Sequence, residues 1–187
     1  LEMGTLVEEQ TSNAIQSLLE TDVKLAEKVI KKDEQINDLE VLIDEEASLL
    51  IAKRSPAAGD LRNIMMMLKI ITDLERMGDE AAKIARSTTR IFENNRMSKS
   101  KFNEIKGMAK AVQEMIKTAL NSFARLDLTD TIDILEKDKQ VDDDYRSTMR
   151  ELLTFMLEDP RTISMSLESM FIAKSLERIG DHAVNIS

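Results

Sequence analysis

The sequences LERMGDEAAKIA, at residues 74–85, and LERIGDHAVNIS, at residues 176–187, are two copies of one motif. When residues 69–85 are aligned with residues 171–187, eight of the 17 positions are identical. Upstream, four residues recur in the same order: Lys32, Asp33, Gln35 and Asp38 as Lys137, Asp138, Gln140 and Asp143. Two matched blocks in the same order indicate a tandem duplication of one structural unit.

The composition and the spacing of apolar residues predict an all-α protein. Aromatic residues make up 3% of the chain, which has five Gly and two Pro, so residues that favour strands and tight turns are scarce. Apolar residues recur at helical spacing along most of the sequence. Turn-forming residues divide this pattern into six expected helices, with breaks at 21–22, 55–56, 93–98, 127–130 and 159–160.

The polar stretch at residues 93–98 is the predicted boundary between the two halves, with a kink in one helix as the alternative. We expect residues 1–95 to form one three-helix bundle and residues 96–187 a second, which stops inside its last helix. Ser55–Pro56 and Asp159–Pro160 each place a capping side chain before a proline suited to the first helical position. Each pair predicts a sharp hairpin between the second and third helices of its half.

Composition excludes several classes of function. The chain has no Cys, which excludes disulfides, iron–sulfur clusters and thiol catalysis, so a metal site would have to use carboxylates. Its longest apolar run, at residues 64–71, is far shorter than the ~20 residues that span a bilayer. With no secretory signal recognised, we expect a cytoplasmic protein without membrane insertion. The formal net charge of −9 argues against nucleic acid as a partner.

Each copy of the motif carries two carboxylates four positions apart, which places them on one helix face. In the second copy they are Glu177 and Asp181. Because both helices of a hairpin rise equally per residue, residues equally far from the turn lie at one level. Counting from Asp159–Pro160 places Asp138 level with Asp181, and Asp142 level with Glu177. Four carboxylates are therefore expected to converge if both pairs face the seam between the helices.

The first half repeats this arrangement with one difference. Its motif pair is Glu75 and Asp79, and counting from Ser55–Pro56 places Asp33 near Asp79 and Asn37 near Glu75. Because Asn37 replaces a carboxylate, we expect the two halves to bind metal unequally.

A cluster of carboxylates needs a counter-cation, and two interpretations supply one. Hard oxygen ligands suit Mg²⁺, Ca²⁺ or Mn²⁺, and iron is also accommodated, so a metal cluster is the preferred interpretation. The alternative is an ion-pair network without metal, in which Arg76 and Arg178 neutralise the neighbouring glutamates. The spacing does not identify the metal.

Other residues of the motif have several explanations. Gly78 and Gly180 lie inside helices, where Gly costs about 1 kcal/mol relative to Ala, so a tightly packed neighbouring helix or a bound ion is expected beside them. His182 is the only histidine and takes the position of Glu80 in the other copy, so we expect a surface or packing residue. Residues 65–67, three consecutive methionines, are predicted to fill the core.

These motifs resemble the PhoU family. The resemblance rests on DLR at residues 60–62, both copies of the motif, and EDPR at residues 158–161, and it covers essentially the whole chain. It implies two pseudo-symmetric three-helix bundles with surface metal clusters held by repeated Glu/Asp-x-x-x-Asp motifs. Carried over to this sequence, those motifs fall on Glu40, Asp44, Glu75, Asp79, Asp138, Asp142, Glu177 and Asp181, while Asp33 with Asn37 departs from the pattern. The metals implied are iron, manganese, magnesium or zinc.

The resemblance also implies a function. PhoU proteins regulate phosphate uptake and phosphate-responsive signalling. We therefore expect a negative regulator without enzymatic activity, which couples a phosphate ABC transporter to a sensor histidine kinase. A homodimer at the cytoplasmic face of the inner membrane is implied.

Two rival interpretations come from other classes of protein. A di-iron enzyme of the ferritin type needs Glu-x-x-His pairs, and the single His182 lies five residues after Glu177, which nearly excludes it. A metal-free acidic helical adaptor, which binds a basic partner surface, remains the alternative.

Overall fold

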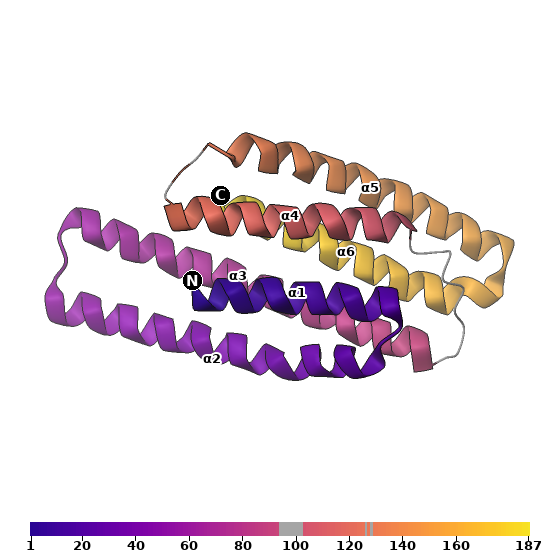
Figure 1. The fold of residues 1–187 in the computed structure, drawn as a ribbon, viewed down its shortest axis with the longest axis horizontal. Coiled ribbons are helices and arrows are strands. Elements are labelled where there is room, and N and C mark those ends of the chain that lie inside the picture. The colour runs from indigo at the N-terminus through magenta and orange to yellow at the C-terminus, as the bar shows by residue number, and fades with distance from the viewer. Residues whose placement is uncertain (94–102, 126, 128) are drawn as a thin grey trace.

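The computed structural model describes residues 1–93, 103–125, 127 and 129–187, and their regular structure is entirely helical. Six long helices follow one another in these residues, with a short 3₁₀ helix before the last: α1 Glu2–Glu20, α2 Val23–Arg54, α3 Ala58–Glu93, α4 Asn103–Arg125, α5 Thr131–Glu158, η2 Pro160–Thr162 and α6 Ile163–Ile186 (Figure 1). The prediction of an all-α fold is confirmed. The boundary predicted between residues 95 and 96 lies outside the described residues.

The helix ends follow the predicted turn chemistry at two hairpins and depart from it at a third. The Asp22 carboxylate caps α2 by accepting a hydrogen bond from the backbone N–H of Leu25 at 3.0 Å. Asp159 accepts one from the backbone N–H of Arg161 at 3.0 Å, and Pro160 opens η2 as expected. The prediction that Ser55–Pro56 opens a helix is wrong. Ser55 ends α2 in a left-handed conformation with φ 43°, and α3 begins only at Ala58.

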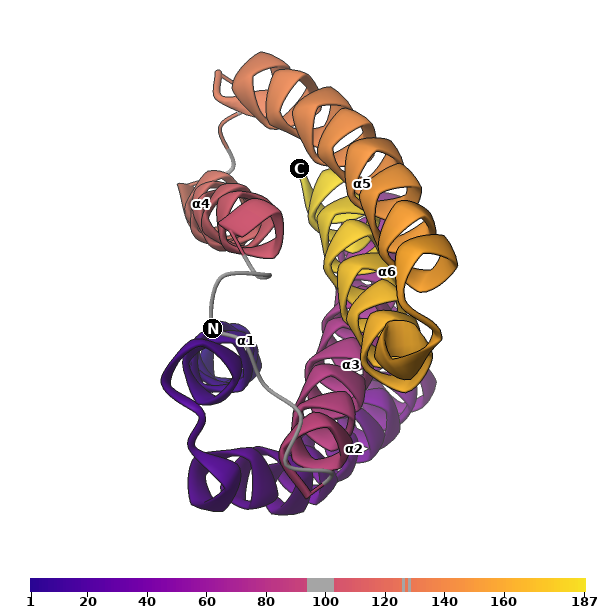
Figure 2. The ribbon, with the colours of Figure 1, turned by 90° about the vertical axis from the view of Figure 1, so that its right-hand side faces the viewer.

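The six helices form two three-helix bundles, α1–α3 and α4–α6, packed against each other. Figure 2 shows α3 and α6 along the middle of the molecule, with α1 and α4 together on one side. The contact between α3 and α6 is the most extensive between any two helices, and α1 also touches α4. The two helices that carry the repeated motif therefore form the junction between the repeats.

One hydrophobic core runs through both bundles. Met77 and Ile84 of α3 and Leu176 and Ile179 of α6 are fully buried and belong to one continuous cluster. Burial of each such side chain stabilises the fold by roughly 1.5–3 kcal/mol. The repeated helices therefore share one hydrophobic core across the junction between the bundles.

The prediction that residues 65–67 fill the core is wrong. Their three methionine side chains are 39% to 48% exposed. The reason is geometric, because α2 and α3 have 32 and 36 residues whereas α1 has 19, so the α2–α3 hairpin extends beyond α1 (Figure 1). Among the described residues, no helix is long and apolar enough to cross a membrane.

Candidate functional site

The second half brings four acidic side chains together between α5 and α6. Asp138 and Asp142 lie on α5, and Glu177 and Asp181 lie on α6. Partial burial raises the pKa of Asp138 above its ordinary value, and the negative charges of the other three raise it further. The pKa of Asp181 is raised in the same way, by burial first and then by Glu177. These four residues are the ones that counting from the hairpin turn placed together.

The first half has an equivalent cluster with a different fourth member. Asp33 of α2 is buried, and burial together with the charge of Asp79 raises its pKa. Burial also raises the pKa of Glu75, and Asp79, Glu40 and Asp33 add to this effect. The fourth carboxylate is thus Glu40, which lies three residues after Asn37.

Two other candidates on α2 are exposed rather than buried in this cluster. Asn37 and Asp44 are exposed on α2. Within the part of the chain that the structure describes, neither forms a hydrogen bond or ion pair with the clustered carboxylates. Sequence counting missed Glu40 because it lies 15 residues before Ser55 whereas Glu75 lies 19 residues after Pro56, but the family motif includes it.

Several of the clustered carboxylates are paired with basic or amide side chains. Lys174 pairs with Glu177 at 2.5 Å, and Asp33 is held by Gln10 at 3.3 Å and by Arg86 at 3.5 Å. In the described ranges, no three Asp, Glu or His side chains are positioned to hold one metal ion. The clusters supply hard oxygen donors, but Asp33 and Glu177 lie in ion pairs and no three side chains of these ranges surround a common point.

The two motif arginines, which were expected to neutralise the neighbouring glutamates, differ in their partners. Arg178 pairs with Glu80 of the other repeat rather than with the adjacent Glu177. In the first copy, the positive charge of Arg76 acts on Glu75 to lower its pKa, against the larger effects that raise it.

The two motif glycines have different surroundings. A Cβ atom added at Gly78 would lie 3.0 Å from the Cδ1 atom of Ile36 and 3.3 Å from its Cγ2 atom. Close packing of α2 on α3 therefore explains Gly78. A Cβ atom at Gly180 would lie 3.6 Å from the nearest atoms, Oδ1 of Asp138 and Cε of Met115, which is an ordinary contact. Packing does not require Gly180.

Between the repeats, α3 and α6 are joined by buried polar contacts. Glu80, which is 5% exposed, accepts hydrogen bonds from Ser175 Oγ at 2.8 Å and from Arg178 Nη1 at 3.0 Å. Lys83 Nζ donates a third at 2.9 Å. Burial alone would raise the pKa of Glu80, but these three hydrogen bonds outweigh it and the pKa is lowered. Glu80 is therefore an ionised carboxylate whose hydrogen bonds link the two halves.

A second contact lies at the equivalent place in the other repeat. His182 Nδ1 lies 2.8 Å from Asp73 Oδ1, and its side chain is only 16% exposed. In the repeat, His182 corresponds to Glu80 and Asp73 corresponds to Ser175. The two contacts are therefore related by a pseudo-two-fold axis between α3 and α6. His182 is a packing residue, as one of the two expectations had it, but its role in joining the repeats was not predicted.

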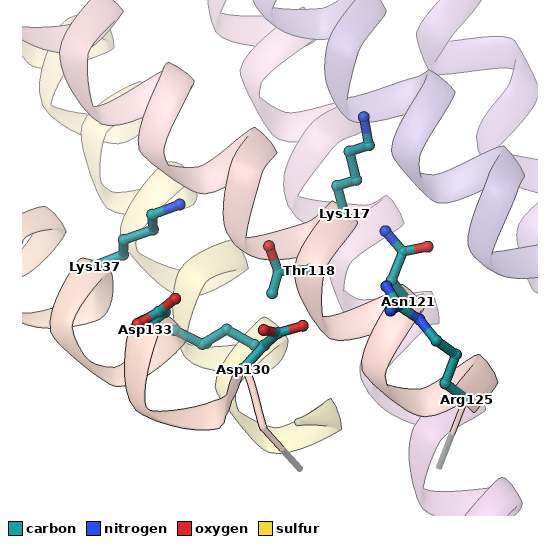
Figure 3. A pocket seen from close by; sticks show the side chains of 8 residues that line it. Lys117, Thr118, Asn121, Arg125, Asp130, Asp133 and Lys137 are labelled. Atoms are coloured by element: carbon teal, nitrogen blue, oxygen red, sulfur yellow. The ribbon is translucent and has the colours of Figure 1, made fainter. Parts of the chain in front are cut away.

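One cavity lies between α4 and the start of α5. Its volume is about 260 Å³, and its lining includes Lys117 and Arg125 of α4 and, from the start of α5, Asp130 and Asp133 (Figure 3). Lys137 also lines it and pairs with Glu114 at 2.8 Å. Acidic and basic side chains are mixed here, so the cavity has no dominant sign of charge.

A larger cavity of about 490 Å³ lies between α3 and α6, over Glu80. It is lined by five basic side chains, namely Lys83, Arg86, Arg90, Lys174 and Arg178. This concentration of positive charge in an acidic chain was not predicted, because its members come from both repeats.

Known proteins match both repeats. The family model described as PhoU domain matches residues 1–88 and residues 105–187. The chain belongs to the PhoU family. Over its full length it is 45% identical to the phosphate-specific transport system accessory protein PhoU homolog of Pseudomonas putida, of which it covers 73%. It is 40% identical to the phosphate-specific transport system accessory protein PhoU of Escherichia coli (strain K12), over 98% of this chain and 76% of that protein.

Solved PhoU structures have the same fold. The crystal structure of PhoU from Pseudomonas aeruginosa superposes with a TM-score of 0.93 at 44% identity, covering all of this chain and 88% of that one. The phosphate transport system regulatory protein PhoU from Streptococcus pneumoniae gives a TM-score of 0.88 at 30% identity, covering 99% and 86%. The resemblance recognised from the two motif copies is thus confirmed.

Proposed function

We propose that this chain is an accessory protein of phosphate transport that acts as a negative regulator of phosphate-responsive genes. It couples the state of a phosphate ABC transporter to a sensor histidine kinase, at the cytoplasmic face of the membrane and without catalysing a reaction. The observation that carries the proposal is the 40–45% identity, across nearly the whole chain, to relatives named as accessory proteins of a phosphate-specific transport system.

The regulatory proposal is tested in cells. Deleting the gene should leave phosphate-starvation genes expressed despite ample phosphate, and a plasmid copy should restore repression. Expression that stays unchanged in the deletion strain would refute negative regulation. Co-purification of the tagged protein with the transporter's ATP-hydrolysing subunit and with the kinase tests the two partners separately, and sedimentation velocity tests whether the protein is a homodimer.

We also propose that the carboxylate clusters hold metal ions of the iron, manganese, magnesium or zinc type. In the second half the ligands would be Asp138, Asp142, Glu177 and Asp181, and in the first half Asp33, Glu40, Glu75 and Asp79. The support is chemical, because hard oxygen donors suit such ions and a cation would relieve the mutual repulsion that raises several of these pKa values. A bound ion would lock α5 to α6 and α2 to α3.

Metal analysis separates this proposal from the metal-free adaptor. The protein is purified without added metal, and its metal content is compared with that of the Glu75→Ala and Asp181→Ala variants. We expect metal in the parent, and less metal in each variant. If the parent carries none, and Mn²⁺, Mg²⁺, Zn²⁺ or iron fails to raise its melting temperature, the adaptor interpretation replaces the metal proposal.

A further inference from the structure

The cavity between α3 and α6 differs in charge from the rest of the molecule. Five basic side chains and one carboxylate, Glu80, line it, which gives the lining a formal charge of +4 in a chain of net charge −9. A concave site lined by one sign of charge concentrates its field and attracts small ions of the opposite sign. The cavity is therefore suited to an anion.

The basic side chains are available to a ligand although each has a carboxylate partner. Arg86 pairs with Asp33 and Arg90 with Glu168, both at 3.5 Å. The five basic side chains are 42% to 59% exposed. A phosphate group makes charge-assisted hydrogen bonds to exposed basic groups of this kind, so it can compete with the carboxylates for them.

Glu80 positions part of this basic lining rather than cancelling it. It is buried at the base of the cavity, where it holds Lys83 at 2.9 Å and Arg178 at 3.0 Å. These two basic groups come from different repeats, and their attachment to one oxygen atom of Glu80 holds them close to each other. The lining is thus partly organised before any ligand binds.

The basic lining is not a by-product of the duplication. In the other repeat, Asn185 takes the place of Lys83, and Thr72 takes the place of Lys174. Of the three basic residues with an equivalent in this chain, Arg178 alone corresponds to another basic residue, Arg76. At two of these three positions, the positive charge of the lining is therefore not repeated in the other copy.

The cavity also has an aromatic wall. Phe171 of α6 lines it and is 57% exposed, which leaves a ring face open to a ligand. Aromatic rings exposed beside basic groups are the elements that bind a nucleic-acid base and its phosphate together. The volume of about 490 Å³ lies within the roughly 300–1,000 Å³ of small-ligand pockets, and one inorganic phosphate would leave most of it unfilled.

We propose that this cavity binds a nucleotide, with its phosphates among the basic side chains of α3 and α6 and its base against Phe171. Such a ligand would contact both repeats and favour the arrangement in which they are joined. The proposal is independent of the regulatory role, because the gene deletion tests that role separately.

Calorimetric titration of the full chain in EDTA tests the ligand class, because the chelator keeps metal away from the carboxylate clusters. The probes are ATP, tripolyphosphate and inorganic phosphate, in ~50 mM NaCl so that exposed charges are not fully screened. We expect ATP to bind about tenfold or more tightly than tripolyphosphate, because only ATP has a base to stack. Equal affinity for ATP and tripolyphosphate, or no binding of ATP, overturns the proposal.

Matched variants test the location. Arg178→Gln should weaken ATP binding about tenfold, because it removes a charged hydrogen-bond donor, whereas Arg76→Gln, at the equivalent position outside the cavity, should leave binding unchanged. An equal loss in both variants would indicate general attraction by positive charge and overturn the proposal.

A second variant guards against loss of folding, since Arg178 also holds Glu80. Phe171→Ala removes an exposed side chain, so its helical circular dichroism should match that of the parent. It should reduce the affinity for ATP to that for tripolyphosphate and leave tripolyphosphate binding unchanged. Unaltered ATP binding in this variant would overturn the assignment of the base site.

Discussion

Glu80 of α3 and Arg178 of α6 form an ion pair of 3.0 Å between residues that are 98 positions apart in the sequence. Arg178 belongs to the second copy of the repeated motif, and Glu80 belongs to the first copy. The pair therefore joins the two copies to each other, at the place where the bundles meet and beside the basic cavity.

Replacing Glu80 should weaken the junction between the repeats. Glu80→Ala removes the acceptor of three hydrogen bonds and leaves the buried Ser175 hydroxyl without this partner, so we expect a loss of about 1–3 kcal/mol in the free energy of unfolding. Urea denaturation measures it. Glu114→Ala, which removes an exposed ion pair with Lys137, is the control and should change the free energy of unfolding much less. Equal losses would contradict a special role for Glu80.

The two motif glycines should respond in opposite directions to the same substitution. Gly180→Ala gains helix propensity without a clash, so the free energy of unfolding should rise by about 0.5–1 kcal/mol. Gly78→Ala forces Ile36 to move, and overpacking of this kind costs about 1–3 kcal/mol, which outweighs the same gain. Thermal melts of both variants check the difference. A fall in stability in Gly180→Ala would mean that this position has a requirement other than packing.

Neutralising one carboxylate of the second cluster should stabilise the metal-free protein. At pH ~7.5 in EDTA, Asp181→Asn removes repulsion acting on Asp138. The free energy of unfolding should therefore be a few tenths of a kcal/mol higher than that of the parent. Because the folded-state pKa of Asp138 and Asp181 is raised, protonation relieves the repulsion as pH falls through that pKa. The advantage of Asp181→Asn should therefore shrink toward pH ~4.

The control for this prediction is the neighbouring Asp143, which is exposed and pairs with Arg146 at 3.2 Å. Asp143→Asn should bring no gain in stability at either pH. If it stabilises the protein as much as Asp181→Asn, the effect reflects overall net charge rather than the cluster.

The methionines of α3 should divide sharply by position. Met66 lies on the exposed part of the α2–α3 hairpin. The Met66→Ala variant should therefore change the free energy of unfolding by no more than about 0.5 kcal/mol. Met77→Ala removes a fully buried side chain and should cost about 2–5 kcal/mol. Chemical denaturation of the pair measures this contrast, and a large loss in Met66→Ala would show that another surface covers the hairpin.

Local features of the fold were predictable because they depend on local sequence. Helix periodicity gave the six helices, and equal rise per residue gave the approach of Asp138 to Asp181 across one hairpin. The end of α2 was mispredicted because Ser before Pro suits either the end of one helix or the start of the next, and the left-handed φ of Ser55 decides between them.

Features that join the two bundles could not be predicted from the sequence. Three features depend on how α3 meets α6: the partner of Arg178, the contact between His182 and Asp73, and the basic cavity. Periodicity identifies the buried face of a helix but not the helix that covers it. The repeat offset did contain a usable signal, because it marks position 80 and its equivalent 182 as places where the copies differ.

The paired contacts across the pseudo-two-fold axis have an implication for the origin of the chain. The same two positions of the repeat contact each other twice, once as Glu80 with Ser175 and once as His182 with Asp73. An isologous interface between identical subunits has this property. A single three-helix protein could make both contacts as a homodimer. Once its gene was duplicated and fused, each former subunit was free to mutate without its twin, and the divergence of position 80 from position 182 is a record of that freedom.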